Sequence, residues 1–229
     1  KGYTIKQWGM SPTEIPASVL KRLPVRFNYD DNYYNHKNQG IPENGYTYIV
    51  DKILKHPNIK VNLGVEFDSS EKNKYTHTFW SGPIDAYFKN KFGKLAYRTL
   101  DFVENTTDGD YQGNAVINYS NIEVPYTRIT EHKHFAPWEV HEKTVYYKEF
   151  SRECDDGDTP YYPIRKVSDK ENLDQYLEAA DLEDGVTFIG RLGTYKYMDM
   201  DVTIADALEQ AKTFLQNRSL DDQKLKNKY

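Results

Sequence analysis

The residues with the clearest capacity for ligand chemistry lie in one stretch, Gly190 to Asp201. It follows an apolar run typical of a strand, Val186 to Ile189, and precedes a segment with apolar residues at helical spacing, Val202 to Leu215. This pattern predicts a crossing from strand to helix. Gly190 and Gly193 would let the backbone turn tightly or approach a ligand, and the helix start would favour an anion or an electron-rich ring edge. An ordinary turn between a strand and a helix is the alternative interpretation.

One asparagine and one arginine could share a ligand-facing surface. Asn118 and Arg128 lie in two β-type runs, Ala115 to Tyr119 and Pro125 to Ile129. The alternation of side chains along paired strands can place both residues on one ligand-facing surface. Arg22 lies at the exit of a predicted helix, where a solvated arginine is the alternative.

Three histidines, His132, His134 and His141, raise the question of a metal site. A structural zinc site needs further cysteine, histidine or carboxylate ligands at a defined spacing. The sequence neighbours of these histidines do not supply them, so we expect no metal.

The overall charge argues against a nucleic-acid partner. The 229 residues carry 30 Lys and Arg against 35 Asp and Glu, a formal net charge of −5. No general positive field exists to hold a nucleic acid, so an anion must be bound locally. The 20 tyrosines combine an apolar ring with a hydroxyl, which suits a polar ligand such as a sugar or a phosphate, although surface tyrosines are the simpler interpretation.

Other features of the sequence bear on the cellular compartment, on membrane binding and on whether the chain is part of a longer protein. The single cysteine, Cys154, cannot form an intrachain disulfide, which favours the cytoplasm. No apolar run approaches the length of a membrane helix, so we expect no membrane partner. The chain begins with Lys1 and not with methionine, so we expect it to be a piece of a longer protein.

The elements that must position these residues are several helices and short strands. We expect helices over 1–8, 11–20, 44–56, 84–92, 170–180 and 202–217, with a frayed tail from 220 to 229. We expect strands over 59–63, 65–67, 76–80, 100–103, 115–119, 126–130, 144–150 and 186–189. The run of strands in the middle of the chain predicts an antiparallel sheet with flanking helices, an α+β fold.

Several short motifs, taken together, resemble the UDP-galactopyranose mutase family. They are Tyr3-Thr4-x-x-Gln7-Trp8-Gly9, Arg22-x-Pro24-Val25-Arg26, Tyr111-Gln112-Gly113-Asn114, Pro125-Tyr126-Thr127-Arg128-x-x-Glu131-His132-Lys133-His134-Phe135, Pro160-Tyr161-Tyr162-Pro163 and Gly190-Arg191-Leu192-Gly193-x-Tyr195-Lys196-Tyr197-x-Asp199-Met200-Asp201. The resemblance is to the C-terminal part of these FAD-dependent enzymes, which interconvert UDP-galactose and UDP-galactofuranose. It implies that N5 of the reduced flavin acts as a nucleophile at the anomeric carbon of the sugar, with no net redox change.

The resemblance also implies a division of the chain into three segments. Residues 1–57 would end a helical domain and carry a mobile substrate loop, and 58–183 would form a mainly antiparallel sheet of about six strands. Residues 184–229 would be the return strand and C-terminal helix of an FAD-binding α/β domain. The whole enzyme would be a homodimer. The family's N-terminal glycine-rich loop for FAD is not in this chain, so an isolated UDP-sugar-binding or structural domain without activity is the alternative.

The resemblance assigns roles to individual residues. The catalytic pair that clamps the UDP diphosphate would be Arg22 and Arg128. Further substrate-binding residues would be Tyr3, Thr4, Trp8, Tyr33, Asn118, Glu149, Tyr162, Tyr197 and Asp199. The residues bordering FAD would be Phe67, Arg191, Tyr197, Met198, Asp199 and Met200.

Overall fold

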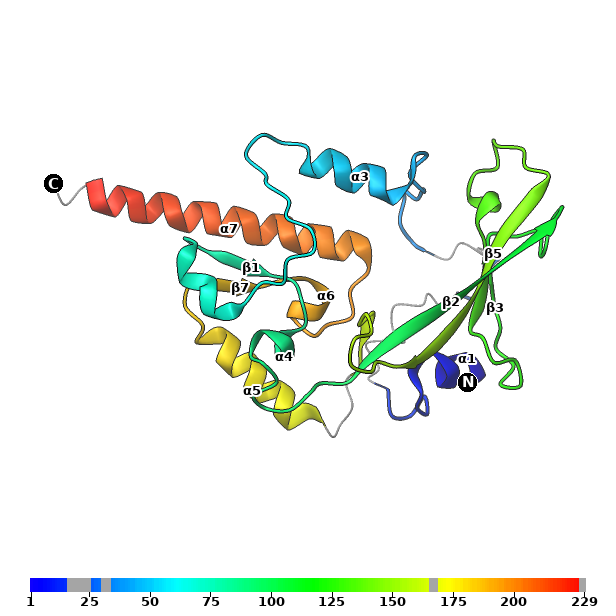
Figure 1. Cartoon of the computed structure of the whole chain (residues 1–229), viewed down its shortest axis with the longest axis horizontal. Coiled ribbons are helices and arrows are strands. Elements are labelled where there is room, and N and C mark those ends of the chain that lie inside the picture. The colour runs from blue at the N-terminus through cyan, green and yellow to red at the C-terminus, as the bar shows by residue number, and fades with distance from the viewer. Residues whose placement is uncertain (16–25, 30–33, 165–168, 227–229) are drawn as a thin grey trace. The chain divides into compact units, whose positions relative to one another are not determined.

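A computed structural model describes residues 1–15, 26–29, 34–164 and 169–226 (Figure 1). The chain separates into two compact units. The first unit comprises Lys1–Glu66 and Leu100–Arg152, and the second comprises Phe67–Thr99 and Glu153–Tyr229. These units have other boundaries than the three segments expected from the resemblance, and that three-part division stays a prediction.

The main sheet has five strands among the described residues, in the order β3-β4-β5-β2-β6. Their bounds are β2 Tyr97–Asp108, β3 Val116–Asn118, β4 Arg128–Glu131, β5 Lys143–Glu153 and β6 Tyr162–Pro163. The pairs β3–β4, β4–β5 and β2–β6 are antiparallel, as expected. The sequence therefore predicted the type of sheet correctly, while the expected number of about six strands is one more than the described residues form.

The register of this sheet decides which side chains share a face. Asn118 pairs with Arg128 across β3 and β4, and Arg128 pairs with Glu149 across β4 and β5. Directly opposed residues point to the same side of a sheet. The predicted common face for Asn118 and Arg128 is therefore confirmed, and Glu149 joins it.

Two helices of the first unit agree with the sequence. Helix α1 (Gly2–Trp8) ends at Gly9, whose φ of 68° is the left-handed conformation typical of a glycine after a helix. Helix α3 (Gly45–Leu54) lies within the predicted range 44–56. The backbone N–H of Ser11 donates to the Glu14 carboxylate at 2.8 Å, the expected capping contact. Of the helix predicted over 11–20, residues 12–14 form a turn and not a helix, and residues 16–20 lie outside the described residues.

The strands expected over 59–63 and 65–67 are wrong. These residues form no strand, and apolar side chains such as Leu63 and Val65 are exposed. Alternating apolar residues form a strand only where a neighbouring strand accepts their backbone hydrogen bonds, and none of the described strands does so here. Phe67 consequently lies outside any strand, with its ring centroid 6.0 Å from that of Trp80.

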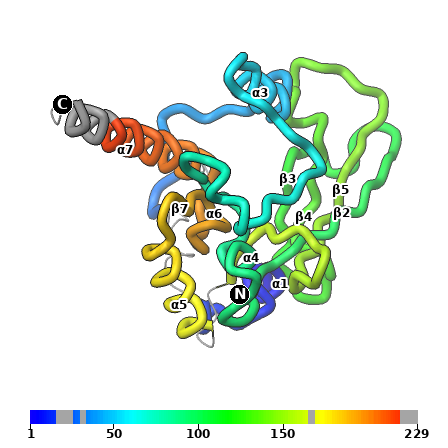
Figure 2. Tube along the Cα trace, turned by 60° about the vertical axis from the view of Figure 1, so that its left-hand side comes forward, coloured from blue at the N-terminus to red at the C-terminus, as the bar shows by residue number. Residues whose placement is uncertain are grey.

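The second unit contains a two-stranded parallel sheet, β1 (Thr78–Trp80) with β7 (Val186–Phe188). Its helices are α4 Ile84–Tyr87, α5 Lys170–Asp181, α6 Gly190–Gly193 and α7 Met200–Lys226, together with the 3-10 helix Ser69–Lys74. Figure 2 shows α5, α6 and β7 gathered together, and α5 contacts β7 while α6 contacts α7.

Two helices of this unit differ in length from the prediction. Helix α4 stops after one turn because Lys89 and Asn90 take left-handed φ angles of 53° and 57°, which a continuing helix does not allow. Helix α7 runs to Lys226 where a frayed tail was expected. Among the helices of the described ranges, none is both long enough and apolar enough to traverse a bilayer.

The core of the second unit is built largely from aromatic side chains. Its fully or nearly buried members are Ile84, Leu95, Tyr97, Leu173, Tyr176 and Tyr195. The Tyr195 hydroxyl lies 2.6 Å from two backbone carbonyl oxygens, those of Ala96 and Ile164. This buried hydroxyl ties the segment after α6 to the start of β2 and to the residue after β6.

Candidate functional site

A group of polar side chains surrounds Arg128 on the sheet face of the first unit. The Arg128 Nη2 donates a hydrogen bond to the Tyr3 hydroxyl at 2.7 Å, and its Nε lies 3.7 Å from Glu149 Oε1. The Arg128 side chain is 33% exposed, whereas that of Glu149 is 8% exposed. The guanidinium is thus oriented from two sides and still open to an anionic ligand.

The Glu149 side chain is buried. Burial raises the pKa of Glu149, while the Arg128 guanidinium and the Thr127 hydroxyl act in the opposite direction. The Thr127 hydroxyl lies 3.2 Å from Glu149 Oε1. Because burial is the largest of these effects, the carboxyl holds its proton more tightly than an exposed glutamate does.

The same sheet face continues into a hollow of about 570 Å³. Its walls are largely apolar and aromatic, with the Glu149 carboxyl at one side, and are formed by Phe102, Thr130, His132, Val145, Tyr147 and Glu149. A hollow of this size with few polar groups is typical of a small-molecule site.

A second group lies in the other unit, around Arg191 of α6. Its guanidinium carbon lies 5.1 Å from the Tyr162 ring centroid and 4.8 Å from that of Tyr197, and the two rings are stacked with an angle of 11°. Arg191 also donates to the carbonyl oxygens of Met198 and Tyr161, at 3.0 and 3.2 Å. The arginine therefore fixes both tyrosine rings and the turn that leads to α7.

The turn itself depends on the two glycines of the stretch from 190 to 201. Gly190 has a φ of 72°, a conformation that favours glycine. At Gly193, an added Cβ would lie 2.6 Å from the Trp80 carbonyl oxygen, so only glycine allows this approach of α6 to β1. The Thr203 N–H donates to the Asp199 carbonyl, and the first N–H groups of α7 therefore point out of the helix end. The predicted strand-to-helix crossing is confirmed, with α6 as an additional short helix.

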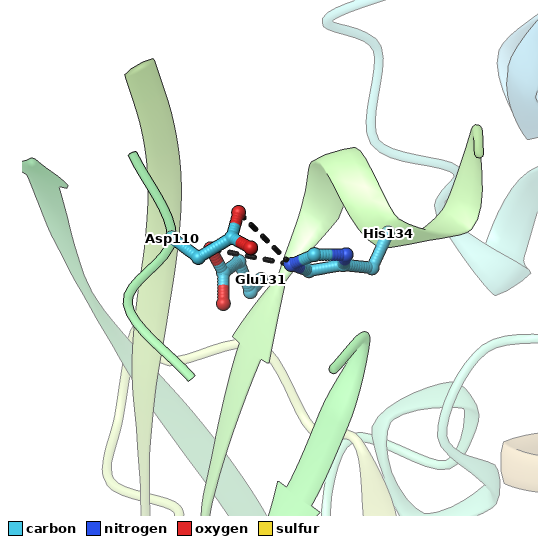
Figure 3. A group of neighbouring side chains, drawn as sticks. All are labelled: Asp110, Glu131 and His134. Carbon is cyan, nitrogen blue, oxygen red and sulfur yellow. Dashed lines mark ion pairs between the residues drawn. The ribbon is translucent and has the colours of Figure 1, made fainter. Parts of the chain in front are cut away.

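The structure also brings together three side chains that could bind a metal, Asp110, Glu131 and His134 (Figure 3). The His134 Nε2 lies 3.5 Å from both carboxylates. However, the Lys133 ammonium already lies 2.5 Å from Asp110 Oδ1 and neutralises it. We interpret the group as a network of ion pairs, and the expectation of no metal stays a prediction.

Glu131 has a structural task in this network. Its buried carboxylate accepts backbone hydrogen bonds from Tyr111, Gln112 and Gly113 at 3.0, 2.8 and 3.1 Å. Burial alone would raise the pKa of Glu131, but these hydrogen bonds lower it to about 2. The carboxylate thereby fixes the loop that leads into β3.

The residues predicted from the resemblance fall into separate sets. In the first unit, Tyr3 contacts Arg128, and Asn118 and Glu149 lie on the same sheet face as Arg128. Thr4 lies in α1, and Trp8 is buried at the end of that helix. In the second unit, Arg191 contacts Tyr162, Tyr197 and Met198. Asp199 and Met200 lie at the start of α7. Phe67 is not part of this group and packs near Trp80. Arg22 and Tyr33 lie outside the described residues.

Three contributors to these groups were missed by the sequence reasoning. Thr127 and Glu131 lie inside a quoted motif but received no role, and Lys6 lies one helical turn after Tyr3. The helical spacing from Tyr3 to Lys6 is a signal that could have found the last of these.

Comparison with known proteins identifies the family. A family model described as UDP-galactopyranose mutase matches residues 1–197. This chain belongs to the UDP-galactopyranose mutase family. It is 60% identical over 215 residues to a probable UDP-galactopyranose mutase of Klebsiella pneumoniae, and 53% identical over 223 residues to a dTDP-fucopyranose mutase of Escherichia coli. Each alignment covers 94% of the chain, but only 56% and 59% of the respective relative. The chain thus spans little more than half the length of these mutases.

A solved structure supports the fold. The crystal structure of a reduced UDP-galactopyranose mutase matches with a TM-score of 0.59 over 86% of the chain and 58% of that protein, at 12% identity. At this identity the match concerns the fold alone. The mixed helix and sheet architecture with an antiparallel sheet is therefore that of the mutase family, and the resemblance seen in the sequence is confirmed.

Proposed function

We propose that this chain is the C-terminal part of a flavin-dependent mutase that interconverts UDP-galactopyranose and UDP-galactofuranose. Beside the family membership, the observation that carries the proposal is the Arg128 guanidinium. It is partly exposed on the sheet face and oriented by Tyr3 and Glu149. A planar guanidinium held in this way can form charge-assisted hydrogen bonds with a diphosphate and fix its position.

The chain's own residues would bind and orient the nucleotide sugar. Arg128, together with Arg22, would hold the diphosphate, and the Tyr162 and Tyr197 hydroxyls would add hydrogen bonds to it. Tyr3, Thr4 and Asn118 would line the region of the uridine and the sugar. Two arginines that bind the diphosphate would also fix the position of the anomeric carbon, and a fixed position favours a reaction at that atom.

The residues around α6 and the start of α7 would border one edge of the flavin ring. The outward N–H groups at the start of α7 favour negative charge, and the Arg191 contact with the Met198 carbonyl fixes the turn before them. The chemistry supplied by bound, reduced FAD would be nucleophilic attack at the anomeric carbon of the sugar. A reduced flavin carries negative charge, so this helix end would favour the reactive state.

A second candidate substrate is dTDP-fucopyranose, because the Escherichia coli relative bears that name. Both nucleotide sugars contain a pyrimidine nucleoside diphosphate. The Arg128 contact to the diphosphate would therefore serve either of them.

Titration of the chain with UDP and with uridine, by calorimetry, tests the proposed diphosphate contact. We expect Arg128→Ala to weaken UDP binding by about 10- to 100-fold, the range that one lost charge-assisted hydrogen bond corresponds to, and to leave uridine binding nearly unchanged. Arg152→Ala is a matched control, because Arg152 lies on the neighbouring strand β5 of the same sheet but pairs with Asp101. Equal weakening of UDP and uridine by Arg128→Ala would contradict the diphosphate role.

The reaction is tested with the full-length gene product that contains this chain. It is incubated with FAD, dithionite and either UDP-galactofuranose or dTDP-fucofuranose, and the products are separated by chromatography. Conversion of the galactose compound supports the proposal, and exclusive conversion of the fucose compound supports the second candidate. Binding of UDP without flavin binding or conversion would indicate a binding module instead.

A further inference from the structure

Helix α1 carries Tyr3, the residue that contacts Arg128, and a helix of seven residues has little stability of its own. Its place on the sheet must therefore come from tertiary contacts. Among the described residues, Lys6, Gln7 and Gly2 each bring α1 close to another part of the first unit, and the contact made by Lys6 comprises three hydrogen bonds.

The Lys6 ammonium donates hydrogen bonds to three backbone carbonyl oxygens, those of Asn121, Val124 and Tyr126. The distances are 3.0, 2.9 and 2.7 Å. These three residues belong to the connection from β3 to β4, and β4 begins with Arg128. A lysine ammonium has three N–H donors, so each of them has one carbonyl partner here.

The two other contacts bring the helix close to the same part of the sheet. The Ser151 hydroxyl of β5 donates to the Gln7 carbonyl oxygen at 2.7 Å. At Gly2, an added Cβ would lie 2.1 Å from the Ser120 carbonyl oxygen, so the helix start is pressed against the connection that Lys6 binds.

We infer that Lys6 is a positioning residue, which fastens α1 to the β3–β4 connection and thereby holds the Tyr3 hydroxyl on the Arg128 guanidinium. Lys6 and Tyr3 lie one turn apart on the helix, so a displacement of the Lys6 end shifts the Tyr3 hydroxyl directly. Loss of the ammonium would remove the donor from three carbonyl oxygens, and two of these hydrogen bonds, those to Val124 and Tyr126, are partly buried. The consequence for ligand binding rests on the proposed function, because it assumes that Arg128 binds the diphosphate.

The partial burial of the ammonium agrees with this task. Burial lowers the pKa of Lys6, because removal from water disfavours the charged ammonium. The carbonyl groups compensate the lost hydration by direct hydrogen bonds. An exposed lysine on the same helix would not restrict the helix in this way.

A double-mutant cycle with UDP as the ligand tests the inference. We expect Lys6→Met, which keeps the aliphatic stem, to weaken UDP binding about 5- to 10-fold, and Lys6→Arg, which keeps N–H donors, to restore most of it. In a Tyr3→Phe background, Lys6→Met should change the UDP affinity less than twofold, because the contact it positions is already absent. Lys1→Met removes the same charge from the exposed residue before the helix and should have no effect.

A general loss of structure would give a different result. It would weaken UDP binding equally with and without the Tyr3 hydroxyl, and this outcome would overturn the inference. Circular dichroism of each variant identifies one that does not fold, and in that case Lys6→Gln replaces Lys6→Met in the cycle.

A second measurement does not depend on UDP. Rotation of the Arg128 guanidinium, measured by nitrogen NMR on the unliganded chain, should be slow in the wild type and faster in Lys6→Met. Unchanged rotation would refute the positioning role. If the wild type shows this difference from Lys6→Met but binds no UDP, the proposed function fails while the positioning role of Lys6 stands.

Discussion

Replacement of Glu131 by glutamine would test whether one buried carboxylate organises the loop before β3. The carboxylate accepts three backbone hydrogen bonds, from Tyr111, Gln112 and Gly113. Glutamine offers a single acceptor oxygen, and its NH₂ group would face a backbone N–H. At least one buried donor would then lose its partner, and the charge-assisted character of the other bonds would be lost as well.

The size of the effect follows from the pKa of Glu131. The ordinary value of 4.5 falls to about 2 in the folded protein, mainly through backbone hydrogen bonds that outweigh burial. At about 1.4 kcal/mol per pKa unit, this difference corresponds to at most about 3 kcal/mol of folding stability. Because the folded pKa is the lower one, the contribution is fully present above pH 4.5 and is lost as the pH falls towards 2. We expect about 2 kcal/mol of it to disappear between pH 7 and pH 3.

The assay is urea unfolding of the wild type and of Glu131→Gln at pH 7 and pH 3, with amide hydrogen exchange of residues 111–113 as a local measure. The stability difference between the two proteins should be largest at pH 7 and about 2 kcal/mol smaller at pH 3. Glu123→Gln is the matched control, because Glu123 is exposed in the same unit. A stability difference that is the same at both pH values, or unchanged exchange in the loop, would refute the reasoning.

Three further predictions concern other parts of the molecule. Arg191→Ala should weaken FAD binding by the full-length protein at least 10-fold, measured by flavin fluorescence, because the turn before α7 loses its hydrogen bonds; unchanged flavin affinity would contradict this. Burial raises the folded pKa of Glu149 from the ordinary value of 4.5, so the wild type should lose stability as the pH rises above about 4.5, and Glu149→Gln should lose less of it; thermal unfolding between pH 4 and pH 7 measures the difference, and parallel curves would disprove it. Tyr195→Phe should cost about 1–3 kcal/mol of unfolding free energy, because a buried hydroxyl near the carbonyls of Ala96 and Ile164 is removed; a loss below about 0.5 kcal/mol, which is the usual scatter of surface substitutions, would contradict this.

Much of the fold followed from local patterns in the sequence. Helical spacing predicted α5 and α3, and alternation predicted the strands that carry Asn118 and Arg128. The two glycines at 190 and 193 indicated the turn before α7, because a left-handed φ and a close backbone approach require glycine. These features are local, since they depend on backbone conformation and on which side of an element a residue faces.

Local patterns were misleading where no partner was within reach. Residues 59–67 alternate as a strand would, yet no described strand pairs with them, and Leu63 is exposed instead. The length of α7 was underestimated because polar residues such as those after Asn217 resemble a frayed tail in sequence. The backbone hydrogen bonds that decide such cases are not encoded in the period of the hydrophobic residues.

The sequence by itself determined the family, most of the elements and the chemical character of the candidate site. Only the tertiary structure decided how that site is held together. Lys6 meets carbonyl groups 115 to 120 residues away, and Glu131 holds N–H groups 18 to 20 residues before it. A side chain's residue type states which hydrogen bonds it can form, but the fold determines which partners come within 3 Å of it.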